Sequence, residues 1–188
     1  MGIIEIIVIS ISLAMDAFAV AISKGLTLKK MSWSKGLITG VYFGVFQAIM
    51  PLIGYFIGST FASYVDKFAH WIAFGILLII GINMIKESFS NEEVDGDFSV
   101  KAMSILAVAT SIDALTVGVS FSMQKPNISI FYIILIIGLI TFVISTLGVL
   151  IGNLFGSKFK KPAEIAGGII LILIAIKVVL SGLGVLPF

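Results

Sequence analysis

The sequence predicts an all-α polytopic membrane protein with six transmembrane helices, arranged as two inverted repeats of three helices each. Three observations lead to this fold class. Hydrophobic residues make up 59% of the chain and charged residues only 12%, whereas soluble domains carry about 25% charged residues. Apolar runs of about 20 residues, the length that crosses a hydrocarbon layer, recur along the whole chain. The two halves of the chain are also similar to each other in sequence.

Six apolar segments are long enough to cross a bilayer, and short connections separate them. The longest polar stretch, 86–101, is acidic and is the only segment with the composition of a soluble loop. The first apolar segment lacks the basic start of a signal peptide, so we expect it to be retained as a helix. The predicted spans are Ile3–Ser23, Gly36–Phe56, Ala69–Ile85, Met103–Met123, Ile130–Ile151 and Ala163–Leu183.

The lysines predict the orientation of the chain, because short loops rich in lysine stay in the cytoplasm. The loops after the first, third and fifth spans hold four, two and three lysines, whereas each of the other two loops holds one. The lysine-rich loops are therefore expected in the cytoplasm. Both termini are then expected on the outer side of the membrane.

The two halves match at three places in the same order. "DAFAVAIS" from Asp16 lies over "DALTVGVS" from Asp113, "PLIGYFIGS" over "VLIGNLFGS", and "IAFGILLIIG" from Ile72 over "IAGGIILILI" from Ile165. Three spans per copy invert the second copy relative to the first, and transporters with such repeats bind their substrate at the midplane between the halves. The predicted organisation is a first repeat over residues 1–90, an acidic cytoplasmic linker over 91–101, and a second, inverted repeat over 102–188.

Two carboxylates, Asp16 and Asp113, stand at matched positions within predicted spans. A charge at the bilayer centre costs on the order of 3 kcal/mol on insertion scales. Inverted symmetry would bring the two Asp side chains face to face, where a divalent cation removes both the burial cost and the repulsion. The alternative is that each Asp is protonated and serves packing alone. Hydroxyl residues that share a helix stripe with one Asp or the other are Ser12, Ser23, Thr116 and Ser120.

Oxygen ligands favour Mg²⁺, Ca²⁺ or Mn²⁺, and the chain has no cysteine and one histidine. Glycines spaced four residues apart, as at Gly36, Gly40 and Gly44, predict close helix packing. Lys177 lies deep in the sixth span and either extends toward the membrane surface or pairs with a carboxylate. Further polar residues within the predicted spans are candidates either to line the transport path or to form hydrogen bonds between helices. These residues are Gln47, Asn83, Ser145, Thr146 and Glu164.

The segments "SLAMDAFAVAISKG", "PLIGYFIG", "HWIAFGILLIIG", "ATSIDALTVGVSF", "STLGVLIG" and "AEIAGG" closely resemble the bacterial manganese efflux pump family (MntP type). The similarity covers essentially the whole chain. It implies a six-helix plasma-membrane exporter of Mn²⁺, with the motif carboxylates on Asp16 and Asp113 and a third acidic position on Glu164. The chain departs from the pattern at Gln47, where members can carry Glu, and at Asn83, which is basic in some relatives.

The resulting hypothesis is a secondary transporter that exports Mn²⁺ from the cytoplasm by alternating access, with possible exchange for protons. The sequence lacks a GxxxxGK[ST] motif, so we expect no use of ATP. We expect no enzymatic activity, no permanent cofactor and no nucleic-acid partner. Two alternatives remain open, namely export of another divalent metal or cationic solute, and intramembrane aspartyl proteolysis. The coupling ion, the metal selectivity, the oligomeric state and the role of the acidic residues 92–97 are also left open.

Overall fold

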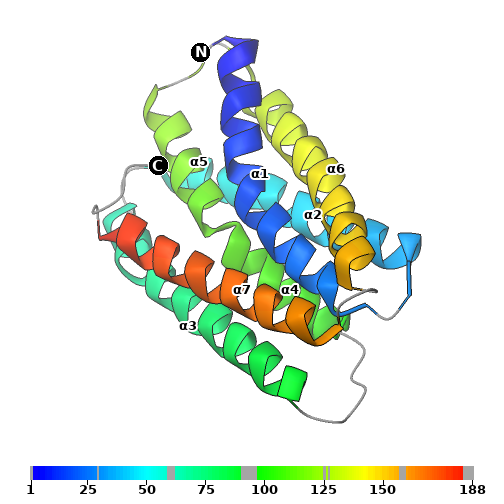
Figure 1. The fold of residues 1–188 in the computed structure, drawn as a ribbon. Coiled ribbons are helices and arrows are strands. Elements are labelled where there is room, and N and C mark those ends of the chain that lie inside the picture. Colours follow the sequence, from blue (N-terminus) through cyan, green and yellow to red (C-terminus); the bar gives the residue numbers. More distant parts are fainter. Residues whose placement is uncertain are drawn as a thin grey trace.

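The computed structural model describes residues 2–28, 30–58, 62–89, 97–124, 126, 128–156 and 160–183. All regular structure within these ranges is helical (Figure 1). The seven helices are α1 (Ile3–Leu26), α2 (Trp33–Ile57), α3 (Ala62–Phe89), α4 (Val100–Thr110), α5 (Ile112–Gln124), α6 (Ile130–Gly156) and α7 (Lys160–Gly182).

Five of the six predicted spans fall on one helix each, namely α1, α2, α3, α6 and α7. Of these, α1, α2 and α6 are long and apolar enough to cross a membrane, whereas α3 and α7 carry shorter apolar stretches, Ala73–Lys86 and Ile165–Leu180. The prediction of one continuous helix over Met103–Met123 is wrong. That segment consists of α4 and α5, which together have the length of a span but are bent by 46° at the break between them.

The break between α4 and α5 lies at a pair of hydroxyl residues. Thr110 Oγ1 donates to the Leu106 carbonyl oxygen at 3.0 Å, and Ser111 Oγ donates to the Ala107 carbonyl oxygen at 2.6 Å. The Ser111 backbone N–H bonds to Val108 instead of the residue four positions earlier. Side-chain bonds to the carbonyls of the preceding turn favour bending, and here two adjacent hydroxyls make such bonds where the Ser111 N–H leaves the α-helical pattern.

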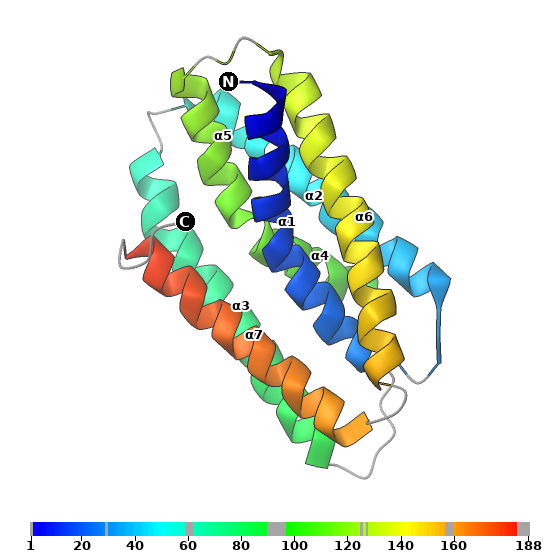
Figure 2. The same ribbon diagram turned by 45° about the horizontal axis from the view of Figure 1, so that its top comes forward.

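The helix α6 is the centre of one layer, and α1 and α2 both pack along it (Figures 1 and 2). Gly148 of α6 lies against Phe18 of α1, and Asn153 further along α6 donates to the Leu28 carbonyl oxygen just after α1, at 2.9 Å. Contacts that advance together along both helices mean that α1 and α6 run in the same direction.

The helix α2 runs antiparallel to α6. A side chain at Gly40 would meet Phe142, and one at Gly44 would meet the backbone of Gly138. The predicted glycine ladder therefore serves close helix packing, as expected from the spacing. On another face, α2 packs against α5, where Gly118 lies against the backbone of Pro51.

The helices α3 and α7 form a second layer of two antiparallel helices beside the first (Figure 2). Gly81 of α3 and Gly168 of α7 allow the two backbones to approach closely. The helix α7 also contacts α1, where Ser23 Oγ donates to the Gly167 carbonyl oxygen at 3.0 Å. The α3–α7 layer thus contacts the rest of the protein mainly through α1, α4 and α5.

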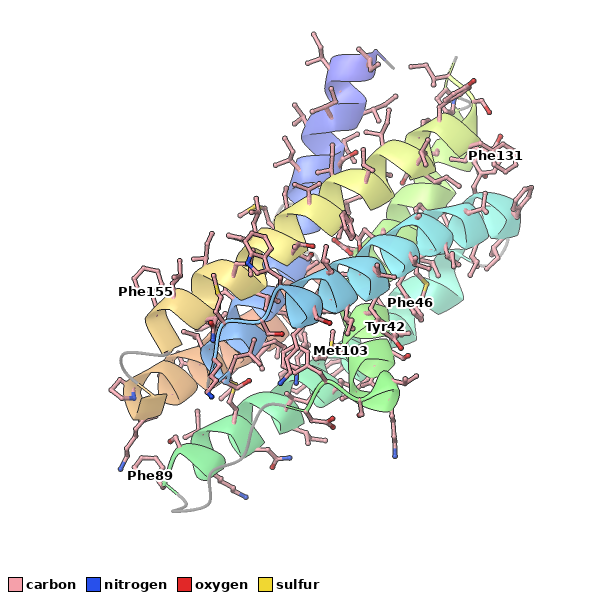
Figure 3. The ribbon with its side chains drawn as sticks, turned by 90° about the vertical axis from the view of Figure 1, so that its right-hand side faces the viewer. Tyr42, Phe46, Phe89, Met103, Phe131 and Phe155 are labelled. Carbon is pink, nitrogen blue, oxygen red and sulfur yellow. The ribbon has the colours of Figure 1, made fainter. Side chains whose placement is uncertain are left out.

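The distribution of side chains is reversed relative to a soluble protein. Phe131 and Phe155, near the two ends of α6, point away from the other helices and are 62% and 64% exposed (Figure 3). Apolar residues cover the outside of α1, α2 and α6, as a lipid environment requires. Tyr42, Phe46 and Met103 instead pack inward between α2 and α4. Fully buried polar residues include Ser10, Thr39, Gln47, Thr141 and Ser145.

The end of the acidic linker is held against the C-terminal end of α1. Lys24 Nζ donates to the backbone carbonyl oxygen of Asp97 at 2.6 Å. The Phe98 ring lies near two ammonium groups, 5.2 Å from Lys24 Nζ and 5.0 Å from Lys35 Nζ. Cations on an aromatic face are attracted by its quadrupole. The end of α1, the start of α2 and the linker before α4 therefore meet at one end of the protein.

Candidate metal site

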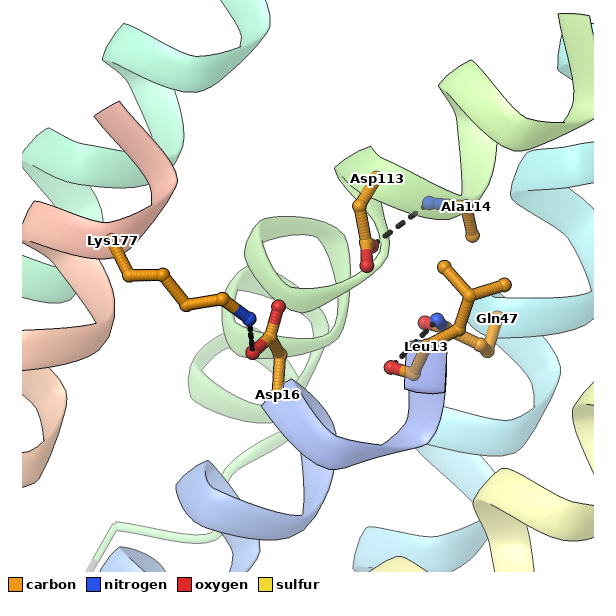
Figure 4. Close-up of polar contacts among 6 residues, drawn as sticks. All are labelled: Leu13, Asp16, Gln47, Asp113, Ala114 and Lys177. Carbon is orange, nitrogen blue, oxygen red and sulfur yellow. Dashed lines mark hydrogen bonds and ion pairs between the residues drawn. The ribbon is translucent and has the colours of Figure 1, made fainter. Parts of the chain in front are cut away.

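Asp16 lies in the continuous part of α1, and its carboxylate is paired with a lysine of another helix. Lys177 Nζ of α7 donates to Asp16 Oδ1 at 2.6 Å (Figure 4). The Asp16 side chain is 16% exposed, whereas the Lys177 side chain is 56% exposed. Of the two roles open for Lys177, the structure therefore supports pairing with a carboxylate.

Asp113 lies in the first turn of α5, directly after the break at Ser111. Its Oδ1 accepts a hydrogen bond from the Ala114 backbone N–H at 2.8 Å. The first backbone N–H groups of a helix have no partner within the helix, and the helix dipole favours negative charge at this end. The broken span therefore places the carboxylate where the backbone itself stabilises it.

The two carboxylates extend toward the same space between α1 and the start of α5 (Figure 4). Asp16, Asp113 and Lys177 lie close enough to interact electrostatically. Each carboxylate also has its own partner, an ammonium for Asp16 and a backbone N–H for Asp113. The arrangement is thus a cluster of two acids and one lysine rather than two acids alone.

Gln47 of α2 adds a neutral oxygen near this cluster. Its Nε2 donates to the Leu13 carbonyl oxygen at 3.2 Å, one turn before Asp16. This bond sets the orientation of the amide and leaves Oε1 buried without a hydrogen-bond partner. A buried acceptor without a partner costs about 1–3 kcal/mol, and a cation is one group that can satisfy it.

Among the side chains that the structure describes, no three His, Cys, Asp or Glu residues come together. A metal held here would therefore have two carboxylate ligands, and its other ligands would be neutral oxygens. Hard divalent cations accept amide oxygens, backbone carbonyls and water beside carboxylates. Asp16 and Asp113 supply carboxylate oxygens of this kind, and Gln47 Oε1 is a buried amide oxygen on a neighbouring helix.

The other predicted residues lie in three different surroundings. Ser12 of α1 and Asn83 of α3 are exposed. Ser23 is buried, and its contacts with Gly167 and with Met84 Sδ at 3.4 Å join three helices. The Glu164 side chain lies outside the described part of the structure. Ser23 therefore contributes to the packing of α1 against α3 and α7.

The hydroxyl residues of α5 and α6 bond mainly within their own helices. Ser120 Oγ donates to the Thr116 carbonyl oxygen at 3.2 Å, and Thr146 Oγ1 donates to the Phe142 carbonyl oxygen at 2.8 Å. Ser145 Oγ, together with Thr141 Oγ1, which the sequence did not single out, is buried without a hydrogen-bond partner. The spacing of Thr141 and Ser145, four residues apart on α6, was the signal that would have found Thr141.

The fold and the site define a helical membrane protein that keeps a cluster of charged residues between its spans. The family described as "Putative manganese efflux pump" (Mntp) matches residues 30–179 of the chain. The chain belongs to this family. Among solved structures, none matches the chain.

Three relatives, each named "Putative manganese efflux pump MntP", illustrate how far the similarity extends. The protein of Acetivibrio thermocellus is 51% identical, over 100% of this chain and 96% of its own length. That of Desulfitobacterium hafniense is 52% identical, over 99% of this chain and 98% of its own length. The protein of Methanobrevibacter smithii is 47% identical, over 96% of this chain and 98% of its own length. The similarity therefore covers whole chains and not one motif.

Proposed function

We propose that this chain is a secondary transporter that exports Mn²⁺ from the cytoplasm across the plasma membrane. The observation that carries the proposal is the approach of Asp16 and Asp113, from matched positions of two repeats, in a membrane protein whose relatives are named manganese efflux pumps. The relatives' names favour transport over the intramembrane protease alternative. Mn²⁺ is then the cargo of the site rather than a resident cofactor.

The proposed architecture is six spans in two inverted repeats, residues 1–90 and 102–188, joined by the linker 91–101. The helix directions support it, since α1 and α6 are parallel whereas α2 and α6 are antiparallel. In the proposed repeat, α1 corresponds to α4–α5, α2 to α6, and α3 to α7. When each helix is replaced by its counterpart, the main pairs of packed helices are reproduced. The pair α1–α6 becomes α5–α2, and α1–α7 becomes α4–α3.

The proposed orientation has both termini outside the cytoplasm. It is supported by the contacts at the end of α1, where Lys24, Lys35 and the linker residues Asp97 and Phe98 come together. Two segments that the lysine count assigns to the cytoplasm thus lie at the same end of the protein. Tagging each terminus and testing its accessibility from outside intact cells would check this orientation.

In the proposed site, Asp16 and Asp113 provide the charge that binds Mn²⁺, and Gln47 Oε1 provides a neutral ligand from a third helix. Two carboxylates balance the charge of one divalent cation, so the loaded site is close to neutral. Mn²⁺ accepts such oxygen ligands. The residues Ser12, Ser23, Asn83, Thr116, Ser120, Ser145, Thr146 and Glu164 remain candidates for the path or for contacts behind the ligands.

Export requires an energy source, and we propose exchange for protons. Mn²⁺ entering from the cytoplasm would displace a proton from the carboxylates, and protons from outside would later displace Mn²⁺. The motivation is that the two carboxylates extend toward the same space. Proton exchange can be tested with the purified protein reconstituted in lipid vesicles. If exchange occurs, an imposed pH gradient should change the rate of Mn²⁺ movement across the vesicle membrane. Transport that neither responds to the gradient nor moves protons would reject proton exchange.

The test of the export function is manganese tolerance in a strain that lacks its own exporter. The intact chain should lower cellular manganese and restore growth in excess Mn²⁺, whereas Asp16→Asn and Asp113→Asn should not. Asp97→Asn is the matched control, because it removes a carboxylate of the linker and leaves the site unchanged. Equal rescue by all four chains would remove both Asp residues from the mechanism.

A further inference from the structure

The Lys177–Asp16 ion pair is not explained by a site that only binds a divalent cation. A lysine beside a metal ligand repels the metal, yet its Nζ lies 2.6 Å from Asp16 Oδ1. It also lies close enough to Asp113 to interact with that carboxylate. In the absence of metal, Lys177 therefore neutralises one of the two acids. Its position is that of a cation that occupies the site when the cargo has left.

The pair is also built to open. The Lys177 side chain is 56% exposed, so its flexible stem can extend along the protein surface and carry the ammonium from Asp16 toward the membrane surface. A lysine makes a compact contact through a flexible four-carbon stem, unlike the rigid two-point contact of an arginine. Lys177 belongs to α7, which packs mainly on α3, whereas Asp16 belongs to the layer around α6. The ion pair thus bridges two layers of the fold.

We propose that Lys177 is a tethered competitor of the transported cation at Asp16. The ammonium holds Asp16 in the empty site, Mn²⁺ displaces it on binding, and its return to Asp16 helps to release Mn²⁺ on the other side. The inference rests on the proposed export function and assigns a role to a residue outside the proposed ligands. With Lys177 paired to it, Asp16 also carries no unpaired charge while the empty transporter returns to its starting conformation.

Competition makes a prediction that a structural role does not. If Lys177 competes, then Lys177→Met should bind Mn²⁺ more tightly, by roughly ten-fold in Kd, because the cation no longer displaces an ammonium from Asp16. The same variant should transport more slowly at saturating Mn²⁺, because nothing replaces the departing ion. Lys177→Arg, with a contact that is harder to displace, should bind Mn²⁺ more weakly than the native chain.

Binding is measured on the purified full-length protein in detergent, by the loss of the electron paramagnetic resonance signal of free Mn²⁺. The matched control is Lys161→Met, which removes an exposed lysine from the first turn of the same helix, roughly 24 Å along α7 from Lys177. The control should bind as the native chain does. An unchanged or weakened affinity in Lys177→Met, with native affinity in the control, would overturn the proposal.

A second measurement uses the native chain and does not depend on a variant that folds. A small amine-acylating reagent should modify Lys177 faster when Mn²⁺ is present than when it is chelated, because the bound metal releases the ammonium from Asp16. Lys161 should show no such change in the same digest, read by mass spectrometry. Equal modification of Lys177 with and without Mn²⁺, under conditions where Mn²⁺ binds, would overturn the proposal.

The two proposals fail in different ways. If the native chain binds no Mn²⁺, or binds it equally with Asp16→Asn and Asp113→Asn, the proposed metal site is wrong and the Lys177 role falls with it. If the native chain binds Mn²⁺ through both Asp residues while Lys177→Met leaves the affinity unchanged, only the role of Lys177 is wrong. Running the four proteins side by side therefore separates the outcomes.

Discussion

The first span and the α4–α5 segment, which align in sequence, place matching aspartates in different electrostatic surroundings. Asp16 lies within the uninterrupted helix α1 and is neutralised by Lys177 from another layer. Asp113 follows a 46° bend and accepts a hydrogen bond from the backbone at the start of α5. In the alignment of the halves, Met84 of α3 stands where α7 has Lys177. Carboxylates within the spans are thus stabilised in two ways, Asp16 by a lysine that is distant in the sequence and Asp113 by a backbone N–H at a local helix break.

The largest loss of stability is expected from substitutions at the glycines where each of these two spans packs against a neighbouring helix. A leucine at Gly118 would collide with the Pro51 backbone, and one at Gly152 would collide with the Ile22 backbone of α1. Collisions with backbone cannot be relieved by a rotamer change, so each variant should lose about 3 kcal/mol of folding free energy. Yield and thermal unfolding in detergent would measure the loss. Gly75→Leu is the control that should retain the native midpoint, because a Cβ added at Gly75 meets no atom within 4 Å.

The helix break is expected to matter for transport more than for stability. Replacing both Thr110 and Ser111 by Ala removes the side-chain bonds that bend the span, so α4 and α5 should straighten and Asp113 should lose its bond to the Ala114 N–H. Mn²⁺ export should then fall roughly ten-fold, which corresponds to about 1.4 kcal/mol. Export from cells preloaded with Mn²⁺ measures this change.

The continuous span offers a control for that prediction. Ser10 of α1 makes the same type of bond, with its Oγ donating to the Ile6 carbonyl oxygen at 2.7 Å, yet α1 is not broken. Ser10→Ala should therefore leave export close to the native rate. A similar fall in both variants would mean that loss of hydroxyl groups, and not the geometry at Asp113, is responsible.

A smaller effect should distinguish the two aspartates in stability. Asp16→Asn leaves the Lys177 ammonium without its carboxylate, at a cost of roughly 1 kcal/mol for a partly exposed pair. Adding Lys177→Met should restore the lost stability without restoring export. Asp113→Asn leaves the Lys177–Asp16 pair intact, so adding Lys177→Met should not restore the stability of this variant. Thermal unfolding of the three variants checks this, and identical behaviour of the two Asp→Asn variants would contradict it.

The smallest effect concerns Asp97, in the linker outside the spans. The Ser99 backbone N–H and hydroxyl hold the pKa of Asp97 below its ordinary value of 3.8, and Lys24 adds to this. Because the pKa is lowered in the folded state, the stabilisation is complete above the unfolded value and is lost as the pH falls through the folded one. The stability difference between the native chain and Asp97→Asn should therefore be constant from pH 8 to pH 5. It should shrink below about pH 4, as followed by thermal unfolding.

Much of the fold was open to prediction because it depends on composition and spacing. The apolar runs located the helices, and the glycine spacing predicted the seam between α2 and α6 that Gly40 and Gly44 form. The break at Ser111 was missed because its signal is weak. Thr110 and Ser111 are common residues in spans, and the same kind of bond at Ser10 leaves α1 intact.

That two carboxylates lie within apolar segments, at positions that match when the halves are aligned, could be read from the sequence because composition and spacing are properties of the chain itself. Which groups lie beside the carboxylates depended on how the helices pack. Lys177 is 161 residues from Asp16 in the chain, and α7 must pack against α1 before the two can meet. The Gln47 oxygen is likewise left without a partner only because its amide donates to Leu13 of another helix. Charge neutralisation depends on distance in space, which residue spacing does not encode.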